Sequence, residues 1–449
     1  MNGPDLARRD FLRLAAGGAA LVATGAGCNT GSDPAKSKAA TAARDRETLR
    51  IAKRTNYIFG YDEWWDGQAR RWGERNGIDV LVEYFDVNQV HAHAASEVAS
   101  KRGHDLFQLV ASAAPFEDDV IDHRDIVEEV RAKFGNMTPF VERSVVNPKT
   151  GKYFAFSDSW NPSPVHYRSD LWEGVGQPGS WDDLLTAGPA LKARGHPIGI
   201  GMAPDIESNV GLLGLMFAYG AAIQDEDARV VINSRATVEA VKAGAALFRS
   251  GMTDEVLAWD ITSNNRYLAS GRGSLIVNSI AALRALEAQD AGLAAKTGLR
   301  PVPAGPAGRF GPYAVNVYVI WAFSEMQEVA KRFLVDLVGD SRASFVESQY
   351  LQHPSFPGAG GELVELVAND SRAQPADKYR LLAGAADWTT NIGYPGHTNA
   401  ASEEVLEASV ISQMFAAAAT GGMTAEEAVR TAEDRIKPIY DKWRDRGKV

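Results

Sequence analysis

The sequence predicts an α/β protein whose core contains parallel β-structure. At 449 residues with 45% hydrophobic residues, the chain is long enough for two ordinary domains and can fill their cores. Strand-like and helix-like segments alternate from residue 48 to residue 110, which is the βαβ pattern typical of parallel sheets. From residue 400 to the end the pattern is helical.

The first elements follow one another closely. "TLRIAKRT" at 48–55, "DVLVEYFD" at 79–86 and "DLFQLV" at 105–110 are rich in β-branched and aromatic residues and predict strands. Between the first two, residues 62–77 predict a helix that ends at Gly77. Its apolar positions place Trp65 in the core.

The middle of the chain adds a capped helix and further strands. Ser180 and Asp183 in "SWDDLL" form a capping-box pattern, which predicts a helix start. Apolar runs bounded by Gly or Pro, before and after this helix, predict extended segments. These runs are 152–156, 162–170, 196–202, 273–280, 299–305 and 313–323.

The last helix carries the clearest local signals. Thr424 and Glu427 form a second capping-box pattern, and apolar residues recur after them at helical spacing. Pro438 lies inside this pattern, and we expect it to kink or interrupt the helix.

The N-terminal region predicts export. Residues 1–28 contain Arg8 and Arg9 before a short apolar stretch, and this region resembles a twin-arginine signal. It ends in "TGAGC", as in a lipoprotein signal, so Cys28 is the expected lipidation site, although Gly25 stands where a large aliphatic residue is usual. Residues 29–45 are small and polar and predict a flexible tether.

Composition excludes several classes of protein. The net charge of −10 and the absence of a basic block beyond the leader argue against nucleic acid as a partner, and one cysteine cannot form an internal disulfide. No phosphate-binding loop, nucleophile elbow or zinc-protease helix is present, so we expect no cofactor. "HAH" at 91–93 allows a metal hypothesis, but His104 and His123 lack ligand spacing, which favours solvated histidines.

Aromatic and amide side chains lie at the ends of predicted strands, where parallel sheets bind ligands. Trp64 follows the first strand and shares a helix face with polar residues, Asn88 follows the second strand, and Gln108 lies in the third. Flat rings and uncharged amides suit a polar solute such as a sugar, because indole packs on C–H faces and amides bond to hydroxyls. We therefore expect these three residues in a ligand site.

The order of motifs over about 400 residues resembles the extracytoplasmic solute-binding proteins of ABC importers, specifically the family 1 group of carbohydrate and maltose binders. The resemblance implies a type II periplasmic-binding-protein fold, in which two α/β lobes joined by crossing strands close on the ligand. It places the first lobe at 46–157 plus 308–357 and the second at 158–307 plus 358–449. The motifs that carry it are "VHYRSDLWEGVGQPGSWDDLL", "SNNRYLASGRGSLIVNS", "PVPAGPAG", "AKRFLVDLVGDSRA" and "MFAAAATGGMTAEEAVRTAEDRIKPIYDKW".

The resemblance also nominates ligand residues by motif. "SWNPS" matches the loop after the crossing, "IVNS" a ligand-facing strand end, "VNVYVIW" the returning strand, and "NIGYPGHTN" the segment before the late helix. Where many members carry a stacking aromatic, this chain offers an aspartate and an asparagine instead. The nominated residues are Trp160, Asn161, Ser163, Asp205, Asn209, Asn278, Ser279, Tyr318, Tyr394 and Asn399.

Together these features predict a monomeric binding protein held at the outer face of the cell membrane, or in the periplasm, by its lipid anchor. It would capture a carbohydrate or sugar-like polyol and deliver it to permease subunits, without catalysis and without a resident metal. Three alternatives remain open at this stage. The protein could bind another polar solute or signal to a membrane sensor, or it could be a hydrolase using Asp158 or Asp205.

Overall fold

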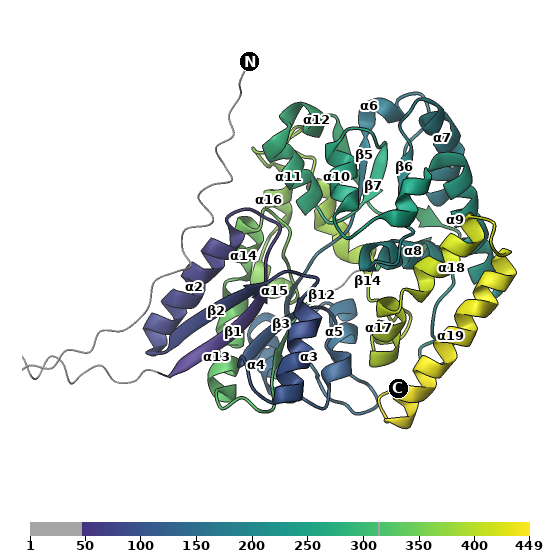
Figure 1. Cartoon of the computed structure of the whole chain (residues 1–449). Coiled ribbons are helices and arrows are strands. Elements are labelled where there is room, and N and C mark those ends of the chain that lie inside the picture. Colours follow the sequence, from purple (N-terminus) through teal and green to yellow (C-terminus); the bar gives the residue numbers. More distant parts are fainter. Residues whose placement is uncertain (1–46, 313–314) are drawn as a thin grey trace, which may run out of the picture. The chain divides into compact units, whose positions relative to one another are not determined.

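The computed structural model describes residues 47–312 and 315–449 (Figure 1). The expected leader, tether and anchor cysteine Cys28 lie outside these residues. Within the described part of the chain, no helix combines the length and the apolar character needed to cross a bilayer.

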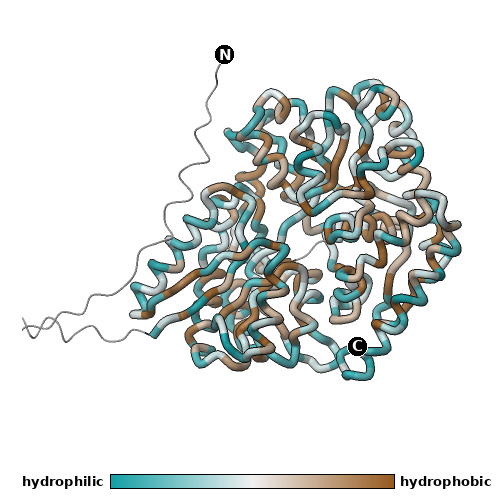
Figure 2. Tube along the Cα trace, viewed as in Figure 1, coloured by the Kyte–Doolittle hydropathy of each residue, from teal (hydrophilic) through white to brown (hydrophobic). Residues whose placement is uncertain are grey.

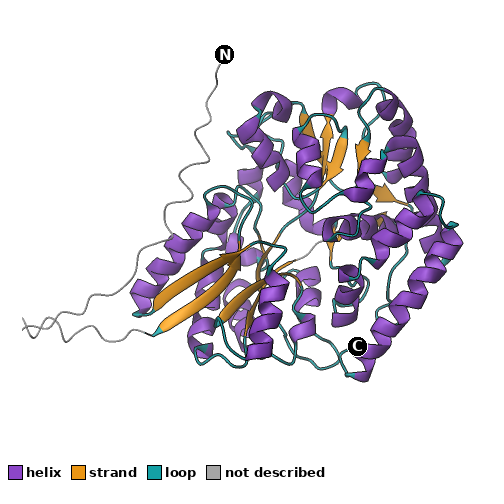
Figure 3. Ribbon diagram, viewed as in Figure 1, coloured by secondary structure: helices purple, strands orange, loops and turns teal. Residues whose placement is uncertain are grey.

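A six-stranded sheet organises one part of the fold, and Figure 3 shows its longer strands in orange. The strand order is β13-β4-β12-β3-β1-β2. β1 pairs in parallel with both β2 and β3, which confirms the predicted βαβ arrangement, while β12 runs antiparallel to β3 and β4. The strands are β1 (Thr48–Arg54), β2 (Asp79–Phe85), β3 (Leu106–Ala111), β4 (Phe156–Trp160), β12 (Val315–Ile320) and β13 (His353–Pro354).

A smaller four-stranded sheet, in the order β6-β7-β5-β8, organises the second half, and two short strand pairs accompany it. These strands are shorter than the apolar runs that predicted them, because much of each run lies in flanking turns. They are β5 (Val165–Arg168), β6 (Ile198–Gly199), β7 (Leu275–Val277) and β8 (Thr297–Arg300), with the pairs β9 (Ala304–Gly305) and β10 (Gly308–Arg309), and β11 (Gly311–Pro312) and β14 (Thr389–Thr390).

The chain passes between the sheets three times. It leaves the first sheet between β4 and β5, returns between β11 and β12, and leaves again after β13. The expected boundary after residue 157 lies inside β4, because that strand stays paired with β12 as far as Trp160. We call the parts built on the first sheet (47–160 and 315–360) the first lobe, and those built on the second sheet (165–312 and 361–449) the second lobe.

Helices of the first lobe pack on its sheet through aromatic contacts. The α2 helix ends at Gly77, whose φ of 71° is the left-handed conformation that glycine adopts without strain, as the sequence predicted. Trp65 and Trp72 pack edge-on against Phe333, with ring centroids 5.7 and 5.1 Å away, so the prediction that Trp65 is core is confirmed. The helices are α2 (Tyr61–Asn76), α3 (Val90–Ser100), α4 (Arg124–Phe134), α5 (Pro139–Val145), α13 (Gln327–Gly339), α14 (Ser341–Glu347) and α15 (Pro357–Gly360), with a 3-10 turn at Ala114–Phe116.

Both predicted capping boxes form in the second lobe, at Ser180 before α7 and at Thr424 before α19. The lobe also contains 3-10 segments at Asp254–Ala258 and Arg380–Asp387. Its helices are α6 (Ser169–Trp172), α7 (Trp181–Ala193), α8 (Ile206–Ala218), α9 (Arg235–Gly251), α10 (Ser263–Ala269), α11 (Ala281–Gln289), α12 (Ala291–Ala295), α16 (Val364–Ala368), α17 (Ala400–Glu407), α18 (Val410–Ala419) and α19 (Ala425–Asp445).

The α19 helix runs unbroken through Pro438, so the expected interruption there is wrong. Hydrophobic and hydrophilic residues alternate along this helix (Figure 2), and its apolar side chains Ile436, Tyr440 and Trp443 are buried. Burial of each such side chain contributes about 1.5–3 kcal/mol, which offsets the roughly 3 kcal/mol that proline costs inside a helix.

Candidate functional site

Two cavities lie between the lobes, at the ends of parallel strands of the first sheet. The first, the His91 cavity, has a volume of about 290 Å³ and follows β2. The second, the Tyr57 cavity, has a volume of about 460 Å³ and follows β1. Both volumes are close to or within the range of about 300–1,000 Å³ found for small-molecule sites, and strand ends are where α/β proteins place them. The His91 cavity is lined from the first lobe by Val87, Asn88, His91 and Val110 and from the second by Pro204, Asp205, Ile206, Ile261, Ile392, Glu403, Leu406, Glu407 and Ser409.

The Tyr57 cavity carries exposed aromatic rings on its first-lobe wall. Phe59 is 96% exposed and Tyr57 is 46% exposed, although both lie in the loop directly after a buried strand. The opposite wall includes Arg284, whose guanidinium bonds to Asp370 at 2.6 Å and to Glu287 at 2.9 Å. The arginine charge is therefore balanced within the protein, and the cavity offers aromatic faces on one wall and a neutralised cation on the other.

Trp259 lines a small pocket that adjoins the His91 cavity through Asp205. Its ring packs beside Tyr267, with centroids 5.2 Å apart, over the edge of β6. Gly199 makes this packing possible, because a Cβ there would lie 2.6 Å from the Tyr267 ring and 2.8 Å from the Trp259 ring. The second lobe thus has an aromatic in its ligand-side wall that the sequence analysis missed, since residues 199 and 259 meet only in the folded chain.

Carboxylates in this pocket are desolvated. Asp205 caps α8, and its Oδ1 accepts hydrogen bonds from the backbone N–H groups of Glu207 at 3.0 Å and Ser208 at 3.2 Å. Burial raises the pKa of Asp205. Burial, together with the charge of Asp205, raises the pKa of Glu207 to about 7. The pocket therefore presents hydrogen-bonding carboxyl groups with less charge than two solvated acids would carry.

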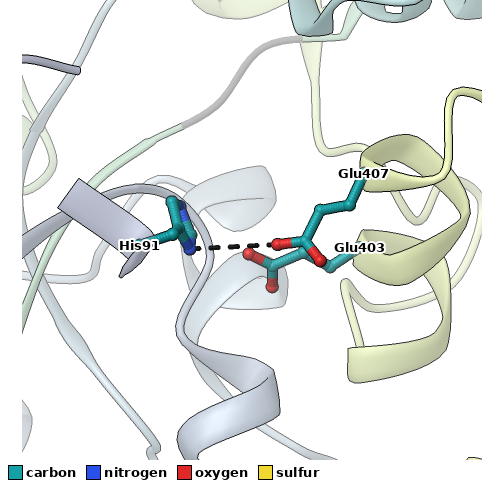
Figure 4. Close-up of side chains that lie close together, drawn as sticks. All are labelled: His91, Glu403 and Glu407. Carbon is teal, nitrogen blue, oxygen red and sulfur yellow. Dashed lines mark ion pairs between the residues drawn. The ribbon is translucent and has the colours of Figure 1, made fainter. Parts of the chain in front are cut away.

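His91 and two glutamates meet across the His91 cavity (Figure 4). His91 lies on α3 of the first lobe, and its Nε2 donates a hydrogen bond to the Val110 carbonyl at 3.0 Å. Its Nδ1 lies 3.9 Å from the Glu407 carboxylate on α17. Glu403, one helical turn earlier on α17, is 3% exposed, and burial followed by the charge of Glu407 raises its pKa to about 8.

Some of the residues nominated from the sequence lie in these cavities. Asn88 lines the His91 cavity, and Asp205 lines both that cavity and the Trp259 pocket. Ser163 lines an adjoining pocket with Trp181 and Glu207. Asn278 donates a hydrogen bond to Asn264, a lining residue of the Trp259 pocket, at 2.9 Å, and its own Oδ1 accepts from the Ser279 N–H at 2.6 Å.

Trp160 lies in the core of the first lobe rather than on a cavity wall. It is 3% exposed and packs against Phe140 and His353, with ring centroids 4.9 and 4.8 Å away. Its indole N–H donates to the Pro354 carbonyl at 3.3 Å. Protein atoms thus satisfy the side chain that the motif comparison had nominated for ligand contact.

Other nominated residues bond or pack within the protein. Gln108 donates to the Tyr318 hydroxyl at 3.2 Å inside the first sheet. Asn209 is fully buried and accepts a bond from the N–H of Ser412, which ties α8 to α18. The remaining four are Trp64, half-buried and stacked on Tyr61; Asn161, buried at the end of β4; Tyr394, packed against Phe217 and Phe310; and Asn399, the N-cap of α17, bonded to Gln224.

The two carboxylates considered for hydrolysis have structural partners. Asp158 is buried in β4 and accepts a hydrogen bond from the Ser159 hydroxyl at 2.9 Å. Asp205 is occupied as the helix cap described above. Neither arrangement adds support to the hydrolase alternative.

Comparison with known proteins places this geometry in context. Residues 61–339 match the family described as bacterial extracellular solute-binding protein. A curated binding protein of Brucella abortus (strain 2308) is 25% identical over 230 residues, or 49% of this chain and 54% of the relative. The chain therefore spans about half the length of the curated relatives it matches.

Solved structures share the fold at low sequence identity. An ABC transporter solute-binding protein from Thermotoga lettingae TMO, bound with α-D-tagatose, is 16% identical with a TM-score of 0.72, over 88% of this chain and 100% of that one. A sugar transporter from Arthrobacter chlorophenolicus A6, with bound laminaribiose, is 18% identical with a TM-score of 0.71, over 87% and 99%. The expected two-lobed periplasmic-binding-protein fold is confirmed.

Proposed function

Because the chain belongs to the bacterial extracellular solute-binding protein family, we propose that it captures a carbohydrate or sugar-like polyol and delivers it to the permease of an ATP-driven importer. Its work is binding and release, without chemical change of the solute. The solute enters between the lobes, and closure of the lobes holds it.

The observation that carries this proposal is the presence of aromatic rings on both lobes, in pockets beside the strand ends. Tyr57 and Phe59 stand exposed after β1, and Trp259 lies in the second-lobe wall. Sugar rings have apolar C–H faces that pack on such rings, and their hydroxyls bond to groups like Asn88 and Asp205. The tagatose and laminaribiose complexes of the two similar structures support the same class of solute.

The proposal extends to the location of the protein. Export through the signal at 1–28 and acylation at Cys28 would keep the binding lobes close to the membrane permease, with 29–45 as the tether. Mass spectrometry of the mature N-terminus tests this part. An acylated Cys28 supports it, and an unmodified cysteine or cleavage elsewhere contradicts it.

A thermal-shift screen tests the solute class. Binding to the folded state increases the free energy of unfolding, by about 2.7 kcal/mol at a ligand concentration 100 times the Kd. The melting temperature rises as a result. We expect shifts with mono- or disaccharides or polyols and none with amino acids or oligopeptides. The reverse pattern overturns the carbohydrate assignment, and turnover of a bound glycan, followed by mass spectrometry, overturns the non-catalytic one.

Delivery to a permease and delivery to a membrane sensor begin with the same binding step. Measuring uptake of the identified solute in cells that lack this protein distinguishes the two roles. Loss of uptake supports delivery to a permease, whereas normal uptake with a lost transcriptional response supports delivery to a sensor.

A further inference from the structure

The side chains of His91, Glu403 and Glu407 form a cluster of hydrogen-bond acceptors that faces the His91 cavity from both lobes (Figure 4). One donor atom from each lies within 4.8 Å of the others. Glu403 and Glu407 are one turn apart on α17, so both project from the same helix face.

The tautomer of His91 is set by its backbone contact. A carbonyl oxygen can only accept, so Nε2 carries the proton that bonds to Val110 at 3.0 Å. Nδ1, the other ring nitrogen, lies 3.9 Å from the Glu407 carboxylate and is the nitrogen left to bind an ion. A backbone bond on the second ring nitrogen is the usual way in which proteins orient a metal-binding histidine.

Glu403 supplies a second observation, which concerns its own hydrogen bonding rather than its distance from the other two residues. It is 3% exposed, and its Oε2 has no hydrogen-bond partner among the described residues, while the Ser112 side chain bonds to the same carboxyl. Within the described part of the chain, neither Glu403 nor Glu407 forms an ion pair with a lysine or arginine. A buried carboxyl oxygen without a partner is costly, and a bound cation would supply the missing partner.

We propose that His91, Glu403 and Glu407 bind a divalent transition-metal ion, zinc by its donor set, which bridges the first lobe to α17 of the second. One imidazole nitrogen and two carboxylate oxygens suit zinc, with a fourth position open to water. Zinc bonds of about 2.0–2.1 Å require donor atoms about 3.3 Å apart, slightly closer than the distance from His91 to Glu407. The three donor atoms lie within 4.8 Å of one another, so the cluster must contract to hold the ion, and Glu407, 54% exposed, has room to move toward it.

The bridge would act independently of the solute. Its ligands come from α3 on one lobe and α17 on the other, so the ion contacts both only when the lobes are close. Metal binding therefore favours the closed arrangement by mass action, whatever else occupies the cleft. This role goes beyond solute capture and does not depend on the identity of the solute.

A competition titration tests the site. The full-length chain is stripped with a chelator and titrated with zinc chloride against a chromophoric indicator. We expect one tight site, weakened at least tenfold in His91→Gln and in Glu407→Gln. His93→Gln is the matched control on the same helix, because His93 stacks on Phe85 outside the cluster, and it should bind zinc like the parent chain.

The controls separate the possible results. Glu407 is exposed, so Glu407→Gln remains informative even if a substitution at buried Glu403 prevents folding. Unchanged zinc binding in His91→Gln and Glu407→Gln, or no saturable site, overturns the proposal. Loss of binding in His104→Gln alone also overturns it, because that histidine pairs with Glu83 and Glu97 elsewhere on the first lobe.

Small-angle X-ray scattering tests the bridge itself. Zinc without sugar should reduce the radius of gyration of the parent chain but not of His91→Gln. Zinc binding without this contraction overturns the bridging role. Either result is independent of the sugar screen, so a failed metal site leaves the proposed solute unaffected.

Discussion

His123 shows how a single buried side chain makes the stability depend on pH. It is completely buried, its Nδ1 donates to the Tyr153 carbonyl at 3.0 Å, and its Nε2 accepts from the Ile320 N–H at 3.0 Å. The accepting nitrogen must stay unprotonated to keep the second bond. Burial accordingly lowers the pKa of His123 to about 4.

We predict that His123 makes the protein less stable in mild acid. Its pKa is about 6.5 in the unfolded chain and about 4 in the fold, so the unfolded state binds more protons between these values. The stabilising contribution is present above pH 6.5 and is lost as the pH falls toward 4, by about 3 kcal/mol in all. Urea unfolding across this range should show a weaker pH dependence in His123→Gln, and an equal dependence would contradict the assignment.

Trp259 allows a prediction about the ligand wall. Trp259→Ala should weaken solute binding by about 1–3 kcal/mol, because it removes an aromatic face from the cleft. Trp64→Ala is a matched control, since Trp64 is half-buried against Tyr61 and outside the cavity linings. Isothermal titration with the solute found in the screen measures both, and equal losses would place the site elsewhere.

At the scale of elements, the sequence predicted what short stretches of chain determine. The parallel β1–β2–β3 unit and both capping boxes follow from local periodicity and hydrogen-bonding residue types, and all of them form. The environment of a loop tryptophan cannot be predicted in this way. Trp160 follows a polar stretch, yet Phe140 and His353 enclose it, and they are distant in sequence. Trp259 and the His91 cluster were missed for the same reason.

Trp160 at the end of β4 therefore yields a prediction about stability. Trp160→Ala should reduce the free energy of unfolding of the solute-free protein by about 3–5 kcal/mol, because it opens a cavity between β4 and its neighbours. Denaturant titration measures this loss, and Trp160→Phe should retain part of the packing. Normal stability combined with lost solute binding would return Trp160 to the ligand site.

At the scale of the whole molecule, the proposed closure would be a rearrangement about the segments that cross between the sheets. Saturating solute should reduce the radius of gyration measured by small-angle X-ray scattering, because the ligand contacts both lobes. The Phe59→Ala, Trp259→Ala double variant should show less contraction at the same solute concentration, since it lacks an aromatic ring on each lobe. Equal contraction in both proteins would show that closure does not depend on these two side chains.

The position of β12 has a consequence for how the chain folds during synthesis. β12 lies between β3 and β4. The β1, β2 and β3 strands, which are made first, therefore cannot join β4 in one sheet until residues 315–320 have been made. The second lobe's sheet, by contrast, is complete by Arg300. On a ribosome, the sheet of the second lobe can therefore form before the sheet of the first lobe is complete.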